Sequence, residues 1–262
     1  PRHRPALSRR TGRIFSAIDR EVERMIRKLI SLERRRTNLR VYHIASLCIA
    51  LCLLGMLYLF AAIPHFDPTE AEEALFLTYT GLITMNNLLA MAAFSILFAV
   101  MGARLIVEAY SGKQAILLLS YPVSRSAVLT AKLVLIGGYT FRAMLLCGGG
   151  ALLIFLLSES LFPLCPEPLQ WHIFLESAVS LLLHSCIAIG VGMVSVWLGL
   201  LRQSLIVSVV TSVLLASVVC QAAAAAFTFA PVLPILSGAA VLLAAAAALA
   251  MLCRIDHMEV LA

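Results

Sequence analysis

The sequence predicts an all-α polytopic membrane protein with six transmembrane helices. Three observations predict this fold: the chain is 61% hydrophobic and only 13% charged, its mean hydropathy is +0.97, and it contains six long apolar segments. Soluble domains are nearer half apolar, with about a quarter of their residues charged. A soluble chain could not bury this much apolar surface, so most of it must face lipid or neighbouring spans.

The six apolar segments are long enough to cross a bilayer, whose hydrocarbon core needs about 20 apolar residues in a helix. They lack the strict alternation of barrel strands, which argues against a β-barrel. Glycines such as Gly190 and Gly192 offer small surfaces for close helix contact. The predicted spans are residues 42–62, 80–103, 133–157, 173–199, 204–229 and 233–253.

Basic residues are distributed unevenly around these spans. Thirteen of the 20 Lys and Arg residues lie between Arg2 and Arg40, before the first span. The connections 63–79, 158–172 and 230–232 contain none. Because cytoplasmic segments of membrane proteins carry the excess of Lys and Arg, we expect both termini in the cytoplasm (N-in/C-in), with the chain in the plasma or inner membrane.

The first 40 residues are predicted to form a basic cytoplasmic tail, and residues 254–262 a short C-terminal one. Within the first tail, residues 14–36 place apolar side chains at helical spacing between arginines. This pattern is typical of an amphipathic helix in the membrane interface, although the same helix could cover a partner surface. The charge suits anionic lipid, and because no nucleic-acid-binding motif accompanies it, we expect no nucleic-acid partner.

Segment 104–132 is the one long connection on the predicted cytoplasmic side. It begins near Glu108, and Gly112 can end the preceding helix. Residues 115–120 then form an apolar turn or two that Pro122 stops. Such a helix must bury its leucine-rich face in the bilayer or in a groove of another protein. A loop that only held the topology would not need this face.

This loop resembles the coupling-helix region in the permease subunits of ATP-binding-cassette (ABC) type-2 exporters. The resemblance consists of a Glu, a Ser-Gly, a Leu-rich run, a Ser-x-Pro-x-Ser-Arg and a Lys, and the arrangement of six spans follows the same layout. Lys113 and the pair Ala115-Ile116 depart from the family pattern. The residues that match it are Glu108, Gly112, Leu118, Leu119, Pro122, Arg125 and Lys132.

The resemblance implies that residues 41–253 form a permease domain that works as a dimer, with a second copy or a paralogue. It also implies export of a substrate driven by a separate ABC ATPase, which would hold the ATP and Mg. The chain itself lacks the P-loop pattern GxxxxGK(S/T), because Gly112-Lys113 is followed by Gln114. We therefore expect it to be no enzyme and to bind no cofactor. The substrate stays open.

Polar residues inside the spans are candidates for the translocation path, because a polar group in a bilayer is a functional hypothesis by default. Arg142 could instead snorkel to the inner interface. His184, which has Ser180 and Ser185 nearby, is either a packed polar residue or a catalytic base. The candidates are Arg142, Asn86, Asn87, His184 and Gln221.

Two other functions remain as alternatives: an integral-membrane enzyme acting on lipid or peptide, and a six-span channel. The spans contain no Asp for an aspartyl protease and no GxSx turn for a serine nucleophile. Cys48 and Cys52 share a helix face but have no His or carboxylate at ligand spacing, so we expect no metal site.

Overall fold

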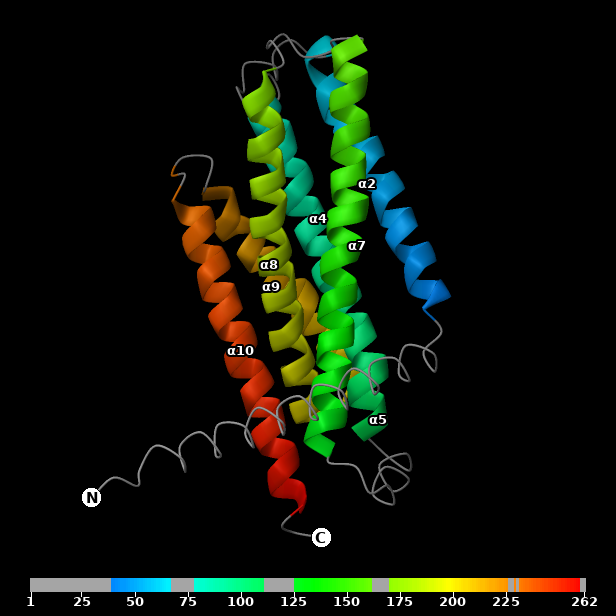
Figure 1. Ribbon diagram of the computed structural model, residues 1–262, viewed down its shortest axis with the longest axis vertical. Coiled ribbons are helices and arrows are strands. Elements are labelled where there is room, and N and C mark those ends of the chain that lie inside the picture. The colour runs from blue at the N-terminus through cyan, green and yellow to red at the C-terminus, as the bar shows by residue number, and fades with distance from the viewer. Residues whose placement is uncertain are drawn as a thin grey trace, which may run out of the picture.

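The computed structural model describes residues 39–66, 78–110, 125–161, 170–225, 229 and 231–259. These residues are almost entirely helical and include no strand. Six helices are long and apolar enough to cross a membrane, and they lie together as one bundle (Figure 1). The predicted all-α polytopic fold is confirmed, and the chain is a multi-pass membrane protein. The amphipathic helix predicted at 14–36 lies outside the described residues.

Each predicted span lies on one helix, although several ends differ. Helix α7 begins well before residue 133, because Arg125 and Lys132 favour helix and do not end it. Helix α9 ends at Ala224, short of residue 229. The predicted connection 104–132 is therefore helical at both of its ends. The six helices are α2 (Arg40–Phe66), α4 (Tyr79–Gly102), α7 (Arg125–Leu161), α8 (Trp171–Arg202), α9 (Leu205–Ala224) and α10 (Val232–Glu259).

Two helices form the centre of the bundle. In their most apolar 18-residue stretches, 67% of the residues on α4 and 61% of those on α8 are buried, against 17–28% on α2, α9 and α10. Helix α8 packs against α4, α7, α9 and α10. The three outer helices expose large aliphatic side chains, such as Ile206 on α9 and Leu242 on α10. These surfaces are suited to lipid or to another membrane-embedded chain.

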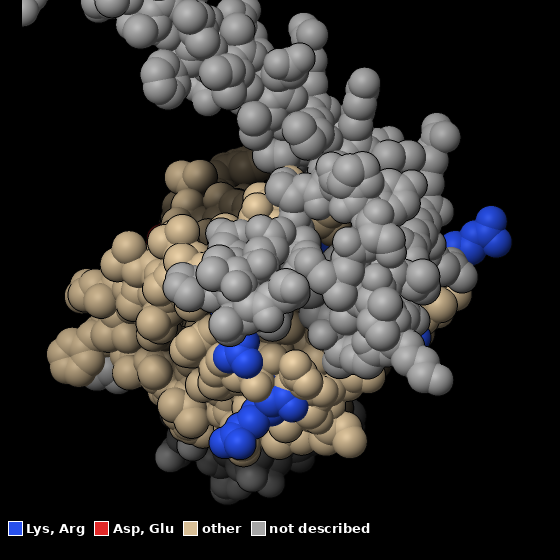
Figure 2. All heavy atoms as spheres, turned by 90° about the horizontal axis from the view of Figure 1, so that it is seen from below, with Lys and Arg blue, Asp and Glu red and all other residues tan. Residues whose placement is uncertain are grey.

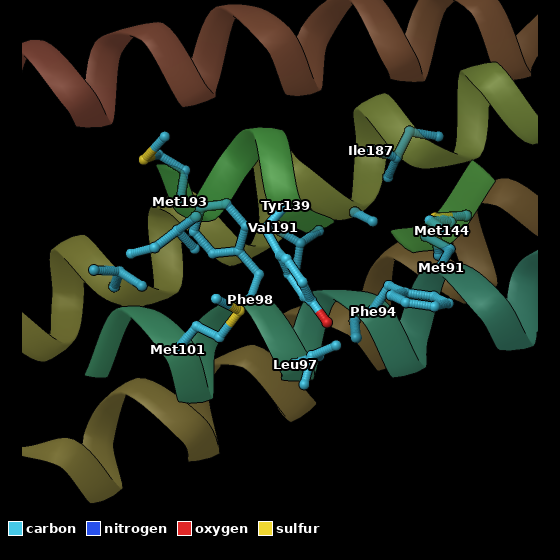
Figure 3. Packing of buried hydrophobic residues seen from close by; sticks show 14 of the residues in the cluster. Met91, Phe94, Leu97, Phe98, Met101, Tyr139, Met144, Ile187, Val191 and Met193 are labelled. Carbon is cyan, nitrogen blue, oxygen red and sulfur yellow. The ribbon is translucent and has the colours of Figure 1, made fainter. Parts of the chain in front are cut away.

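The main core fills the space between α4, α7 and α8 (Figure 3). Helix α4 contributes aromatic rings and methionines, whose flexible side chains fit irregular gaps. Phe94, Phe98 and Met91 are completely buried. The labelled members of this core are Met91, Phe94, Leu97, Phe98, Met101, Tyr139, Met144, Ile187, Val191 and Met193.

Glycines let α8 approach its neighbours closely. A Cβ atom on Gly190 would lie 2.7 Å from the carbonyl oxygen of Ala240 on α10. A Cβ on Gly192 would lie 2.5 Å from the ring of Phe98 on α4. The predicted close helix contacts at these two glycines are confirmed, because no larger residue fits there without moving a neighbour.

Candidate functional site

Basic residues gather at one end of the bundle, where α5 (Glu108–Tyr110), α8 and α10 end and α7 begins (Figure 1). Figure 2 views this end, with Lys and Arg in blue. At the opposite helix ends, the described residues include no Lys or Arg. We call the first the basic end of the molecule. Its basic residues are Arg40, Arg104, Arg125, Lys132, Arg202 and Arg254.

At the basic end, α4 does not stop but continues through a π-helical turn, η2 (Ala103–Val107), into the short helix α5. The backbone N–H of Glu108 donates to the carbonyl of Ala103, five residues earlier. In an α-helix the acceptor would be four residues earlier. Single π turns inside α-helices occur frequently at functional sites.

Lys132 of α7 is bonded to this π turn. Its Nζ donates to the carbonyl oxygen of Leu105 at 2.8 Å, and the side chain is only 6% exposed. Around it, Ile106 and Val107 of η2 and Leu129 of α7 are completely buried. A buried ammonium needs polar partners. The bond therefore fixes the start of α7 against the end of α4.

The bond from Lys132 to Leu105 joins the two chain segments from which residues 111–124 depart. Glu108, which begins α5, is exposed beside it. Tyr42 of α2 is 7% exposed and lies within electrostatic range of Arg104 and Glu108. We call this junction of η2, α5 and the first turns of α7 the loop root.

A second set of polar contacts ties α2 to α7 next to the loop root. The hydroxyl of Tyr139 on α7 lies 3.1 Å from Ser46 Oγ and 3.2 Å from His43 Nδ1, both on α2. The ring of Tyr139 also packs edge-on against Tyr42, with centroids 6.5 Å apart. This contact could not be predicted from the sequence, because its residues are 93 and 96 positions apart.

The structure places three of the seven predicted coupling residues. Glu108 and Lys132 lie at the loop root, and Arg125 is the first residue of α7. Both Arg125 and Lys132, predicted within the connection 104–132, belong to helix α7. The remaining four lie outside the described residues, as does the predicted apolar helix: they are Gly112, Leu118, Leu119 and Pro122.

Inside the bundle, polar side chains of α4 and α8 meet. The amide nitrogen Nδ2 of Asn87 donates to Ser180 Oγ at 3.0 Å. His184 Nδ1 donates to the Ser180 carbonyl oxygen at 2.8 Å. Asn87 and His184 are 0% exposed, and Asn86, the residue before Asn87 on α4, is 1% exposed. We call these four residues the α4–α8 polar cluster.

The other two candidates for the translocation path lie apart from this cluster. Arg142 is exposed, and its Nε donates to the Gly138 carbonyl one turn earlier on α7 at 2.9 Å. Gln221 is exposed on α9. The five predicted residues therefore do not form one path within a single chain. Arg142 and Gln221 are on the outer surface, where lipid or a second chain would meet them.

The bonds of His184 bear on the alternative of an integral-membrane enzyme. His184 Nδ1 already donates its proton to a carbonyl, so it cannot accept the proton of Ser180 Oγ, which lies 3.4 Å away on the same helix. Among the residues that the structure describes, no three His, Cys, Asp or Glu side chains lie close enough to hold a metal ion.

No family model matches the chain, and no solved structure matches it. The chain is similar to the uncharacterized protein YcbO of Bacillus subtilis (strain 168). The two are 25% identical over 187 residues, which cover 71% of this chain and 80% of that protein. The similarity therefore extends over most of both chains.

Proposed function

We propose that this chain is the transmembrane permease subunit of an ABC transporter of the type-2 class. It would couple ATP hydrolysis by a separate ATPase subunit to the export of a substrate. The observation that carries the proposal is the loop root: the segment with the ABC-2 pattern departs from a π turn that Lys132 of α7 holds. The ATP and Mg would belong to the ATPase.

The charge distribution supports an orientation in which the basic end faces the cytoplasm. Cytoplasmic segments are enriched in Lys and Arg, and the loop root, the start of α2 and the end of α10 lie toward this end (Figure 1). Residues 111–124 would then be on the side where ATP is available. We therefore propose the plasma or inner membrane as the location, with both termini cytoplasmic.

The packing supports a route by which motion of the loop would reach the spans. A pull on residues 111–124 acts first on η2 and on the start of α7. The bond from Lys132 to Leu105 makes these two segments move together. Because α4 is a central helix, its displacement would change the contacts that it makes with α8. Transport then follows from different substrate affinities in two conformations.

The outer helices support a dimer, with a second copy or a paralogous permease. Helices α2, α9 and α10 expose continuous apolar surface, which membrane lipid or a partner span would cover. An enzyme acting on lipid or peptide is less well supported, because no described hydroxyl contacts His184 Nε2, the ring nitrogen that could act as a base.

Copurification tests the proposal directly. The tagged full-length chain is isolated in mild detergent, and its bound partners are identified after crosslinking from residues 108–125. We expect a polypeptide that contains a P-loop. Crosslinks from this segment to lipid alone, with no ATPase in the complex, would contradict the proposal.

Uncoupling variants test the role of the loop. Replacing Glu108→Ala or Pro122→Ala should reduce the stimulation of ATPase activity by the permease to the basal level, because both changes remove contacts of the docking segment. The spans should stay folded, since Glu108 is exposed. Glu176→Ala is the matched control, because Glu176 is also exposed but lies near the opposite end of the bundle. Full stimulation in both loop variants would exclude the docking role.

A further inference from the structure

The geometry points to a binding site for a hydrogen-bond donor, a hydroxyl or a protonated amine, at the α4–α8 polar cluster. The cluster combines Asn86 and Asn87 of α4 with Ser180 and His184 of α8. It lies within two helices that are long and apolar enough to span the membrane. Polar groups at such positions are costly, and their usual explanation is function.

The cluster has more hydrogen-bonding atoms than partners. Among the described residues, no partner contacts Asn86 Nδ2, Asn86 Oδ1, Asn87 Oδ1 or His184 Nε2. Native proteins satisfy the great majority of their buried polar atoms. An unsatisfied buried group weakens folding. Four such atoms on three neighbouring side chains therefore indicate a ligand, not a structural network.

Other polar residues of α8 behave differently. Ser177 Oγ donates to the Phe174 carbonyl at 2.8 Å, and Ser185 Oγ donates to the Leu182 carbonyl at 2.7 Å. These hydroxyls are satisfied within their own helix, as is common for serine in apolar helices. The polar cluster therefore differs from these serines, whose hydroxyls bond to a carbonyl of their own helix.

The unpartnered atoms define the chemistry of the ligand. Because His184 Nδ1 donates to a carbonyl, Nε2 of the neutral ring is an acceptor. The amide nitrogen of Asn87 donates to Ser180 Oγ, and its Oδ1, which has no partner among the described residues, is a second acceptor. Asn86, the preceding residue of α4, has an unpartnered amide oxygen, which accepts, and an unpartnered amide nitrogen with two N–H donors. Because His184 Nε2 and Asn87 Oδ1 are acceptors on the two facing helices and neither has a partner among the described residues, the cluster is suited to a molecule that donates hydrogen bonds.

Access to the cluster requires motion, because its asparagines and histidine are at most 1% exposed. A separation of α4 from α8 would expose all three side chains. The binding site rests on the proposed function only where we identify its ligand as the transported molecule. Binding itself can be measured on the isolated chain.

A matched series of amphiphiles tests the site. Decylamine, 1-decanol and decyl methyl ether have the same alkyl chain, but the ether donates no hydrogen bond. Each is titrated into the purified full-length chain in lipid nanodiscs, and the Kd is measured from tryptophan fluorescence. We expect the amine and the alcohol to bind about tenfold more tightly than the ether, as one or two hydrogen bonds would give. Equal affinities for all three would overturn the proposal.

Variants test whether the preference for the amine and the alcohol over the ether arises at the polar cluster. Asn87→Leu should reduce the difference between the amine and the ether to less than about twofold, because an acceptor is lost while the volume is kept. If Asn87→Leu does not fold, His184→Phe decides, since it preserves a ring of similar size. The control is Ser212→Ala on α9, which removes a buried hydroxyl outside the cluster. An undiminished preference in His184→Phe would also overturn the site. If no ATPase copurifies but the preference is present, only the proposed function fails.

Discussion

Lys132 shows how one side chain can define the loop root. A lysine that is 6% exposed loses its hydration, and the Leu105 carbonyl at 2.8 Å compensates for part of that loss. Hydrogen bonds to charged groups contribute about 1.5–3 kcal/mol. The bond acts between α7 and the π turn, so it stabilises a local backbone form as well as a contact between helices.

Replacing Lys132→Met should loosen the loop root. Methionine keeps the apolar stem but cannot donate to the Leu105 carbonyl, so we expect unfolding to require about 1–3 kcal/mol less free energy. Amide hydrogen exchange should become faster at residues 103–110 and remain unchanged around Phe94 and Phe98. Arg142→Gln is the control, because Arg142 is exposed; it should change the free energy of unfolding by less than about 0.5 kcal/mol. Unchanged exchange at residues 103–110 would show that Lys132 does not hold the π turn.

The sequence predicts the residues of the loop root better than their arrangement. Glu108 and Lys132 follow from the ABC-2 pattern, and the structure brings the two segments that contain them together. The π turn could not be predicted, because Ala-Arg-Leu-Ile-Val favours an α-helix as readily as a π-helix. The bond from Asn87 to Ser180 is similarly hidden, since its residues are 93 positions apart and only tertiary packing brings them together.

Among the elements, α8 shows how small residues set helix spacing. The Cβ clash at Gly190 involves backbone atoms of α10, which cannot rotate away as a side chain can. Helix association in a membrane depends on close packing, because lipid chains are as apolar as leucine. Gly190 therefore fixes the distance between α8 and α10.

Gly190→Ala should force α8 and α10 apart. We expect a loss of about 1–3 kcal/mol in the free energy of unfolding, as is typical of overpacked interiors. Gly238→Ala is the matched control on α10, where a Cβ would meet no atom within 4 Å. Alanine favours helix over glycine by up to about 1 kcal/mol, so the control should be neutral or stabilising. Thermal unfolding in the same detergent compares the two variants. Equal unfolding temperatures for the two variants would mean that α10 shifts without loss of stability.

Hydropathy predicts the membrane-crossing part of each helix more accurately than the helix ends. The predicted spans 80–103 and 173–199 agree with α4 and α8 to within a few residues. For α7 the predicted start is residue 133, whereas the helix begins at Arg125. Apolar content marks the stretch that enters lipid, but a helix can continue beyond it through charged residues that favour helix. The start of α7 therefore depends on helix propensity, which hydropathy does not measure.

At the scale of the whole molecule, the buried central helices differ from the outer helices in the side chains that they carry. The two central helices, α4 and α8, carry the polar cluster, and α4 leads directly into the π turn. The outer helices carry mostly apolar surface. The loop root and the polar cluster are therefore joined by one continuous helical segment. The proposed coupling role requires that the basic end face the cytoplasm.

Labelling of single cysteines tests that orientation. The seven native cysteines are first replaced by alanine. One new cysteine is then introduced at Gln170, directly before α8, or at Gln203, directly after it; both positions are exposed and lie at opposite ends of that helix. Because Lys and Arg are retained on the cytoplasmic side, a membrane-impermeant maleimide should label Gln170→Cys in intact cells. It should label Gln203→Cys only after permeabilisation. The reverse pattern would place residues 111–124 outside the cell, out of reach of ATP, and would rule out a coupling role for them.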